Sequence, residues 1–181
     1  MSALEFAAVH GRACAGLKGP RAAEWLGARG IASPAVPNSW VSSSAPGNCP
    51  ELLVARLGSA EFFLEDAADG RALPDLKSAL AAGSPGVYPV LREDAGFRLS
   101  GDGVHDALAQ VCNVNFAELA LGAHPVIMTL MIGVAVLVVP QGPDAERSYR
   151  IWCDPTFAPA LSEEVGNVIV ECGGIIRGET G

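Results

Sequence analysis

Charged residues are scarce in this sequence. Asp, Glu, Lys and Arg make up 18% of its 181 residues, while hydrophobic residues make up 50%. Globular proteins of average composition contain about 25% charged residues. Two interpretations of this shortfall stand side by side: partner chains cover part of the surface, or alanine replaces polar residues at exposed positions, where it costs little.

Basic residues are scarcer than acidic residues. The chain has 12 Lys and Arg against 20 Asp and Glu, which gives a net charge of −8. Because contacts from Lys and Arg to phosphate dominate nucleic-acid affinity, this balance argues against a nucleic-acid partner. It argues equally against attraction to an anionic membrane surface.

The sequence also lacks a hydrophobic run long enough to cross a membrane. The longest run, Val126–Val139, lies between Pro125 and Pro140. As a helix it would rise about 21 Å, which is short of the ~30 Å hydrocarbon core of a bilayer. Its β-branched residues and Gly133 predict buried strands instead.

Neither a disulfide framework nor a secretory signal is indicated. The five cysteines are odd in number and widely spaced, and no two form a Cys-x-x-Cys pair: Cys14, Cys49, Cys112, Cys153 and Cys172. Such cysteines are typical of reduced thiols, not of disulfides or a zinc site. Residues Met1–Leu17 have no basic cluster before an apolar block. We therefore expect a cytoplasmic location.

An internal repeat is the first positive signal. Segments Cys14–Leu26 and Gly96–Leu108 align when Gly19 is placed on Gly101. Each segment predicts a short strand, a glycine turn and then a helix. In the first copy Pro20 would be the first helical residue. In the second copy Asp102 would be the N-cap, and Val104, Ala107, Leu108 and Val111 would form the apolar face of the helix.

The repeat continues with a predicted hairpin in each half. The first joins Leu52–Arg56 to Glu61–Leu64 around Gly58. The second joins Val126–Leu130 to Val134–Val139 around Gly133. A glycine in each turn supplies the positive φ that tight hairpins need.

A helix is predicted after each hairpin. It covers about Leu73–Ala81 in the first half and about Pro155–Val165 in the second, where a further strand at Tyr149–Cys153 precedes it. Each half therefore follows the pattern β-α-β-β-(β)-α, which predicts an α+β fold with helices on one face of a mostly antiparallel sheet.

The expected domain organisation follows the two copies. Residues 1–85 form the first half-repeat, with a long irregular Ser/Pro-rich loop at 32–50, and residues 86–176 form the second. The Gly/Pro-rich segment Gly83–Pro89 would be a hinge between them. The polar residues 177–181 would be a flexible tail.

Three segments of the second half together resemble a known family. They are Ala107–Asn115, the pattern Thr129-x-x-x-Gly133-Val134, and Tyr149–Phe157. From about Leu17 to Gly174 the chain resembles the gamma subunit of heteromeric sarcosine oxidase. That subunit is similar in turn to the folate-binding aminomethyltransferase family.

The resemblance implies two tandem ferredoxin-like β-α-β-β-α half-domains. It also implies an accessory subunit that docks on the large alpha subunit of a complex that oxidatively demethylates sarcosine and transfers the one-carbon unit to tetrahydrofolate. By this resemblance FAD, FMN, NAD and tetrahydrofolate belong to partner subunits. No catalytic or metal-binding residue and no bound cofactor is expected of this chain, and no cofactor-binding residue is assigned. The alternatives are a stand-alone folate-binding one-carbon module and the equivalent subunit of an N-methylglutamate-type dehydrogenase.

Several residues are candidates for chemistry. The segment Ser100–His105 follows a strand and opens a helix, as a dinucleotide fingerprint does, but Asp106 stands where the third glycine belongs. A turn with an N-cap explains the segment better. His10, His105 and His124 have no catalytic spacing, and no Gly-x-Ser-x-Gly motif accompanies them. His105 and Cys112, two helical turns apart, lack a third metal ligand nearby.

The remaining candidates each have a functional and an ordinary interpretation. Cys49 is either a reactive thiol or an incidental loop cysteine. Asp154, before Pro155, is either a folate-binding carboxylate or a helix N-cap, and the cap is favoured. Arg56, Arg98 and Arg150 come from predicted strands or their ends. They would bind a carboxylated ligand, a partner's acidic residue or, by default, surface acids of this chain.

Overall fold

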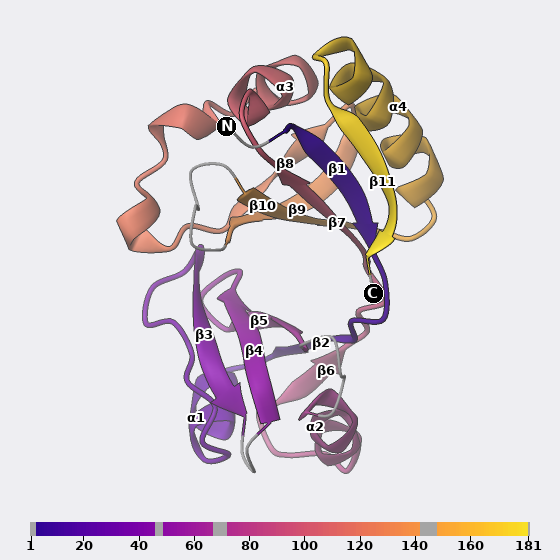
Figure 1. Ribbon diagram of the computed structural model, residues 1–181. Helices are drawn as coiled ribbons and strands as arrows, with labels where there is room; N and C mark the ends of the chain where they lie inside the picture. The colour runs from indigo at the N-terminus through magenta and orange to yellow at the C-terminus, as the bar shows by residue number, and fades with distance from the viewer. Residues whose placement is uncertain (1–2, 46–48, 67–71, 142–147, 181) are drawn as a thin grey trace. The chain divides into compact units, whose positions relative to one another are not determined.

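The computed structural model describes residues 3–45, 49–66, 72–141 and 148–180 (Figure 1). They form two compact units. The central unit is Gly11–Glu93, and the terminal unit is Met1–His10 together with Asp94–Gly181. The predicted division into 1–85 and 86–176 therefore needs correction, because the first ten residues belong with the second half and the boundary lies after Glu93.

The central unit is an antiparallel sheet with two helices on one face. The strand order is β3-β4-β5-β2-β6, and all neighbours are antiparallel. Its elements are β2 (Cys14–Lys18), α1 (Ala22–Gly27), β3 (Ser39–Ala45), β4 (Cys49–Arg56), β5 (Glu61–Glu65), α2 (Ala72–Ala81) and β6 (Tyr88–Val90). The predicted first hairpin and the helix after it are thus confirmed.

The core of the central unit follows the two periodicities of strand and helix. On β5, Phe62 and Leu64 point into the core between the sheet and the helices, so the intervening Phe63 points to the opposite face. On α2, the buried residues are Leu73, Leu76 and Leu80, the spacing of one helical face.

The start of α2 is capped by a residue that lies well before it in the sequence. Oδ2 of the fully buried Asp66 accepts the backbone N–H groups of Ala72 at 2.8 Å and Leu73 at 2.9 Å. The first N–H groups of a helix have no partner within the helix, so this carboxylate satisfies two of them.

The terminal unit has a six-stranded sheet in the order β11-β1-β7-β10-β9-β8. Among its described strands, the β1–β11 pair alone is parallel. Its elements are β1 (Glu5–Val9), β7 (Ala95–Ser100), α3 (Val104–Val111), the 3-10 turns η1 (Phe116–Glu118) and η2 (Leu121–Ala123), β8 (Ile127–Met131), β9 (Val134–Pro140), β10 (Ser148–Cys153), α4 (Ala158–Glu171) and β11 (Ile175–Thr180).

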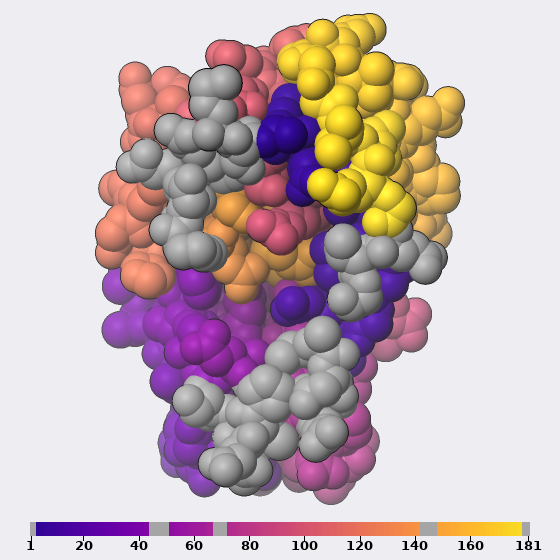
Figure 2. Space-filling model, in the orientation of Figure 1, coloured from indigo at the N-terminus to yellow at the C-terminus, as the bar shows by residue number. Residues whose placement is uncertain are grey.

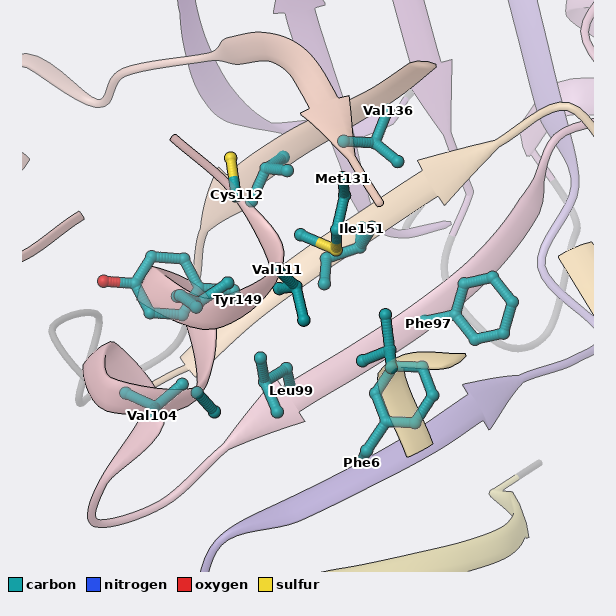
Figure 3. Close-up of a cluster of buried hydrophobic side chains, with 14 of the residues drawn as sticks. Phe6, Phe97, Leu99, Val104, Val111, Cys112, Met131, Val136, Tyr149 and Ile151 are labelled. Carbon is teal, nitrogen blue, oxygen red and sulfur yellow. The ribbon is translucent and has the colours of Figure 1, made fainter. Parts of the chain in front are cut away.

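The core of the terminal unit lies between this sheet and the helices α3 and α4 (Figure 3). Phe6 of β1 stacks on Phe97 of β7, with ring centroids 5.4 Å apart. The predicted apolar face of α3 is confirmed, because its four buried residues are Val104, Ala107, Leu108 and Val111. Figure 3 shows Val111 lying over the sheet between Leu99 and Met131.

The two units repeat one topology, with an offset from the predicted alignment. When β1 is left out, β11-β7-β10-β9-β8 matches β6-β2-β5-β4-β3 strand for strand. The hairpin β4–β5 therefore corresponds to β9–β10, not to β8–β9. The strand that completes the match is β3, which lies inside the segment 32–50 that was predicted as an irregular loop. This seven-residue strand pairs with β4, and its Ser-rich sequence did not predict it.

The ends of the chain also differ from the prediction. Arg177, expected in a flexible tail, lies in β11, which pairs in parallel with β1. Figure 2 shows the yellow C-terminal segment at the surface beside the indigo N-terminal one. Similarly, the predicted hinge Gly83–Pro89 lies within the central unit and leads from α2 into β6.

Three predicted helix starts are misplaced by a few residues. Pro20 lies in the turn before α1, whose N-cap is Arg21. The N-cap of α3 is Gly103, not Asp102. Helix α4 begins at Ala158 with Pro159 in its first turn, three residues after Pro155.

Candidate functional site

The space beside the glycine turn before α3 is occupied by backbone from the start of the chain. Gly101 has φ +112°, and a Cβ placed on it would lie 2.0 Å from the carbonyl oxygen of Ala3. The close approach that a dinucleotide fingerprint reserves for pyrophosphate is therefore made here by backbone. Strand β7 is also antiparallel to both its neighbours. The turn interpretation of Ser100–His105 fits this geometry, although the cap residue was misassigned.

The three histidines lie in separate parts of the terminal unit. His105, the second residue of α3, hydrogen-bonds through Nε2 to the hydroxyl of Tyr149 at 2.8 Å. Tyr149 is fully buried and packs edge-on against Phe116, with ring centroids 5.3 Å apart. His124 ends η2 with φ +49°, and His10 follows β1. His105 therefore has a structural partner from a neighbouring strand.

The described cysteines are held in local contacts. Cys112 lies one residue beyond α3, with Sγ 3.7 Å from the hydroxyl of Thr129. Burial, with help from Asp94 and Asp154, raises the pKa of the Cys153 thiol to about 11. Cys172 accepts a hydrogen bond from Nε2 of Gln110 at 3.1 Å. The side chain of Cys49, the predicted reactive candidate, lies outside the described residues.

Among the described residues, no group of three or more His, Cys, Asp or Glu could hold a metal ion. Within the same part of the chain, no helix is long and apolar enough to span a membrane.

Asp154 organises the turn that leads into α4. Its Oδ1 accepts from the backbone N–H of Thr156 at 2.8 Å and from the Thr156 hydroxyl at 2.5 Å. These two hydrogen bonds lower the pKa of the Asp154 carboxyl. Asp154 is therefore a turn-forming residue ahead of the helix. The predicted N-cap role needs this correction, because Phe157 occupies the cap position.

Arg56 is satisfied by backbone carbonyl groups. Its guanidinium donates to Pro34 at 3.1 Å, to Ala35 at 2.6 Å, to Gly58 at 3.2 Å and to Ser59 at 2.5 Å. It also lies over the ring of Phe62, 5.5 Å from its centre. Arg56 thus ties residues 34–35 to the β4–β5 turn, and these bonds leave it little capacity for a ligand carboxylate.

Arg98 and Arg150 form the arrangement that best fits an anionic group. They are directly opposite on β7 and β10 and project from the sheet face away from α3 and α4. Arg150 is 5% exposed; its Nη1 donates to the carbonyl of Phe97 at 3.0 Å, and its guanidinium lies 5.0 Å from the centre of the Trp152 ring. Like charges at opposite strand positions destabilise a sheet, so this pair favours a carboxylate beside it.

Gly96 makes room for this pair. A Cβ on Gly96 would lie 3.1 Å from Nη2 of Arg150 and 3.6 Å from the Trp152 ring. Arg98 is exposed, and its side chain forms no hydrogen bond or ion pair with the described residues. Arg150 is therefore fixed in place, while Arg98 can reach a ligand.

A hollow of about 380 Å³ in the central unit is a second candidate. It lies between α2 and β6, and the sequence did not predict it. Its charged residues are Lys77, Arg92 and Glu93, and the rest of the lining is aliphatic or glycine. Gly16 allows β6 to pass closely, since a Cβ there would lie 3.0 Å from Val90 and Arg92. Glycine inside a predicted strand was the available signal.

The comparisons with known proteins agree with this fold. The chain is similar to the aminomethyltransferase T of the glycine cleavage system from Bartonella henselae, with a TM-score of 0.72 and 14% identity. That match covers 98% of this chain and 48% of the other, so this chain spans about half of its length. No protein-family model matches the sequence, and no curated protein matches it either.

A second similar structure is a heterotetrameric sarcosine oxidase from Corynebacterium sp. U-96 in complex with pyrrole 2-carboxylate. The TM-score is again 0.72, the identity is 21%, and the match covers 94% of this chain and 85% of that one. These likenesses show the shared fold: two mostly antiparallel sheets in an α+β architecture like that of the aminomethyltransferase and the oxidase chain, as predicted.

Proposed function

We propose that this chain is an accessory subunit of a heteromeric, flavin-dependent oxidase of the sarcosine oxidase type and that it docks on a larger subunit. The observation that carries the proposal is the extent of the second match. It covers 94% of this chain and 85% of the other, so the chain that this one resembles is of similar size and belongs to a heterotetramer. The aminomethyltransferase, by contrast, is about twice as long.

The local structure around the candidate residues supports an accessory role. His105, Asp154 and Arg56 are each engaged in hydrogen bonds that hold their own unit together. In the proposed complex the chemistry lies in partner subunits, which would bind FAD, FMN, NAD and tetrahydrofolate and oxidise the N-methyl group of sarcosine.

Affinity purification of the tagged chain from cells that express its neighbouring genes tests this proposal. We expect a larger protein to co-elute with flavin absorbance and with sarcosine-dependent peroxide formation. N-methylglutamate in place of sarcosine distinguishes the N-methylglutamate-type dehydrogenase. A monodisperse monomer without flavin would overturn the proposal.

A stand-alone folate-binding module is the alternative. The exposed Arg98 favours it, since folates carry carboxylates and a guanidinium group suits such groups. The hollow beside β6 fits a pterin poorly, because none of the described residues that line it is aromatic. Titration of the isolated chain with tetrahydrofolate decides between the two. Binding that is lost in Arg98→Gln supports the alternative, and no binding at high micromolar folate rejects it.

A further inference from the structure

Three of the four outer strands of the two sheets have features that discourage pairing with another chain. Strand β6 has only three residues, one of them Pro89. Strand β3 is serine-rich and has a register shift between Ser44 and Ala45. On β11, Arg177 forms an ion pair with Glu5, and the β1–β11 register shifts after Ala7. Short length, proline, bulges and charge are the usual protections of exposed sheet edges.

The fourth outer strand, β8, has none of these features. Its five residues pair with β9 in continuous register from Ile127 to Met131. Met128 is 53% exposed and Leu130 is 60% exposed, both on the face away from the core, and Ile132 in the adjoining turn is 41% exposed. An edge strand of this kind tends to bind another strand.

The sequence around β8 is free of charge. Residues 119–141 contain no Asp, Glu, Lys or Arg, in a chain of net charge −8. Natural proteins place charged residues beside exposed apolar strands to prevent association. The chain omits that protection at the outer strand where the apolar side chains are most exposed.

We propose that β8 is the docking edge of this chain, and that a larger partner chain adds an extended, uncharged strand along Ile127–Leu130. This inference rests on the proposed accessory role and specifies where docking occurs. The edge is limited at one end by the chain itself, because Cys112 bridges Met131 and the N–H of Ile132 donates to the carbonyl of Val111 at 2.9 Å. The incoming strand contributes backbone hydrogen bonds, and its apolar side chains cover Met128 and Leu130.

Charge favours a different chain over a second copy as the occupant. A second copy would bring the same net charge of −8. The uncharged hairpin has no basic residue to offset that repulsion. A partner of another sequence has no such restriction.

The test compares complexes assembled by co-expression. Tagged wild type is purified beside Leu130→Lys, with Met128→Lys as a second variant and Val170→Lys as a control at an exposed apolar site on α4, 57% exposed. Thermal melts confirm folding. We expect Leu130→Lys and Met128→Lys to retain less than about one tenth of the flavoprotein, because a charged side chain must be desolvated in the interface. Val170→Lys should retain it all.

Hydrogen exchange provides an independent measurement. The backbone N–H of Ile132 points away from β9, so those of Met128 and Leu130 do too, while those of Ile127 and Thr129 point to β9. The amides of Met128 and Leu130 should therefore become protected in the complex, which side-chain contact alone would not cause. If wild type recruits no flavoprotein, both the function and the docking edge are overturned. If the β8 variants recruit as much as wild type does, only the edge is overturned. A homodimer that the β8 variants dissociate would also overturn the edge proposal, with a second copy as the occupant.

Discussion

Gly19 and Gly101 occupy the same place in the two copies of the repeat, and each faces a carbonyl oxygen of another segment. Gly19 has φ +128°, and a Cβ on it would lie 2.3 Å from the oxygen of Gly86. Gly101 has φ +112° and faces Ala3 in the same way, at 2.0 Å. Two constraints, positive φ and close backbone approach, therefore require glycine at both positions.

Gly19→Ala and Gly101→Ala should each lower the free energy of unfolding by more than about 3 kcal/mol, because strain and steric overlap add. Gly103→Ala separates the two effects. Its φ is +82° and a Cβ there would have nothing within 4 Å, so this substitution should cost only about 1 kcal/mol. Urea denaturation of the three variants checks this. Equal losses of unfolding free energy in the three variants would show that overlap with the carbonyl oxygens contributes nothing to the destabilisation.

Arg56→Ala should destabilise the protein by about 2 kcal/mol, because the carbonyl groups of the 34–35 segment and the β4–β5 turn lose a charged donor. Arg56→Lys should recover little of this loss, since an ammonium group lacks the planar fork that reaches four carbonyls. Arg98→Ala is the matched control and should change stability by less than about 0.5 kcal/mol. Thermal denaturation measures all three. Full rescue by lysine would contradict the prediction.

Asp66→Ala should destabilise the protein by about 1–2 kcal/mol, because Ala72 and Leu73 lose their cap. Asp66→Asn keeps a side-chain oxygen acceptor and should lose less stability than Asp66→Ala. Hydrogen exchange at the first turn of α2 should rise in Asp66→Ala and stay slow in α3, which serves as the internal reference. Unchanged exchange in α2 would show that the cap is dispensable.

Tyr149→Phe should cost about 0.5–1.5 kcal/mol, since it removes one hydrogen bond and keeps the packing on Phe116. A double-mutant cycle with His105→Ala isolates the contribution of the His105–Tyr149 hydrogen bond. If the two substitutions are additive in chemical denaturation, the hydrogen bond makes no net contribution to stability.

Cys153 should make stability fall at alkaline pH. Its folded pKa is about 11 against an ordinary value of 9.0, so the thiol ionises more readily in the unfolded chain. The stabilisation is present below pH 9.0 and is lost as pH rises toward about 11. Cys153→Ala should flatten this part of the stability curve.

The reactivity of the thiols provides a second measurement. In native protein at about pH 8, Cys172 should react with iodoacetamide well before Cys153 does. A Cys153 that reacts as fast as Cys172 would refute the buried, protonated thiol.

Local patterns predicted most of the elements that bury one apolar face. The amphipathic spacing of Val104, Ala107, Leu108 and Val111 located α3, and the apolar run after Pro125 located the β8–β9 hairpin. The paired glycines Gly19 and Gly101 revealed the duplication. These features depend on residues close together in the chain, which is why they can be predicted from it.

Features that depend on distant residues were missed. Strand β3 reads as a loop because serines replace the β-branched residues typical of strands, and it forms by pairing with β4. The N-terminal strand β1 requires β11, far away in sequence. The cap of α2 by Asp66 spans a gap that no capping motif covers. Of the candidate site, strand arginines were predicted, but the direct opposition of Arg98 and Arg150 depends on a register that sequence alone does not specify.

The interruption of the terminal unit by the central unit has a consequence for synthesis of the chain. Residues 11–93 are contiguous, so the central unit can fold as soon as they leave the ribosome. Strand β1 is synthesised before the central unit, and its two partners, β7 and β11, are synthesised after it. Nascent chains arrested before residue 175 should therefore hold a folded central unit and a terminal sheet that lacks β11.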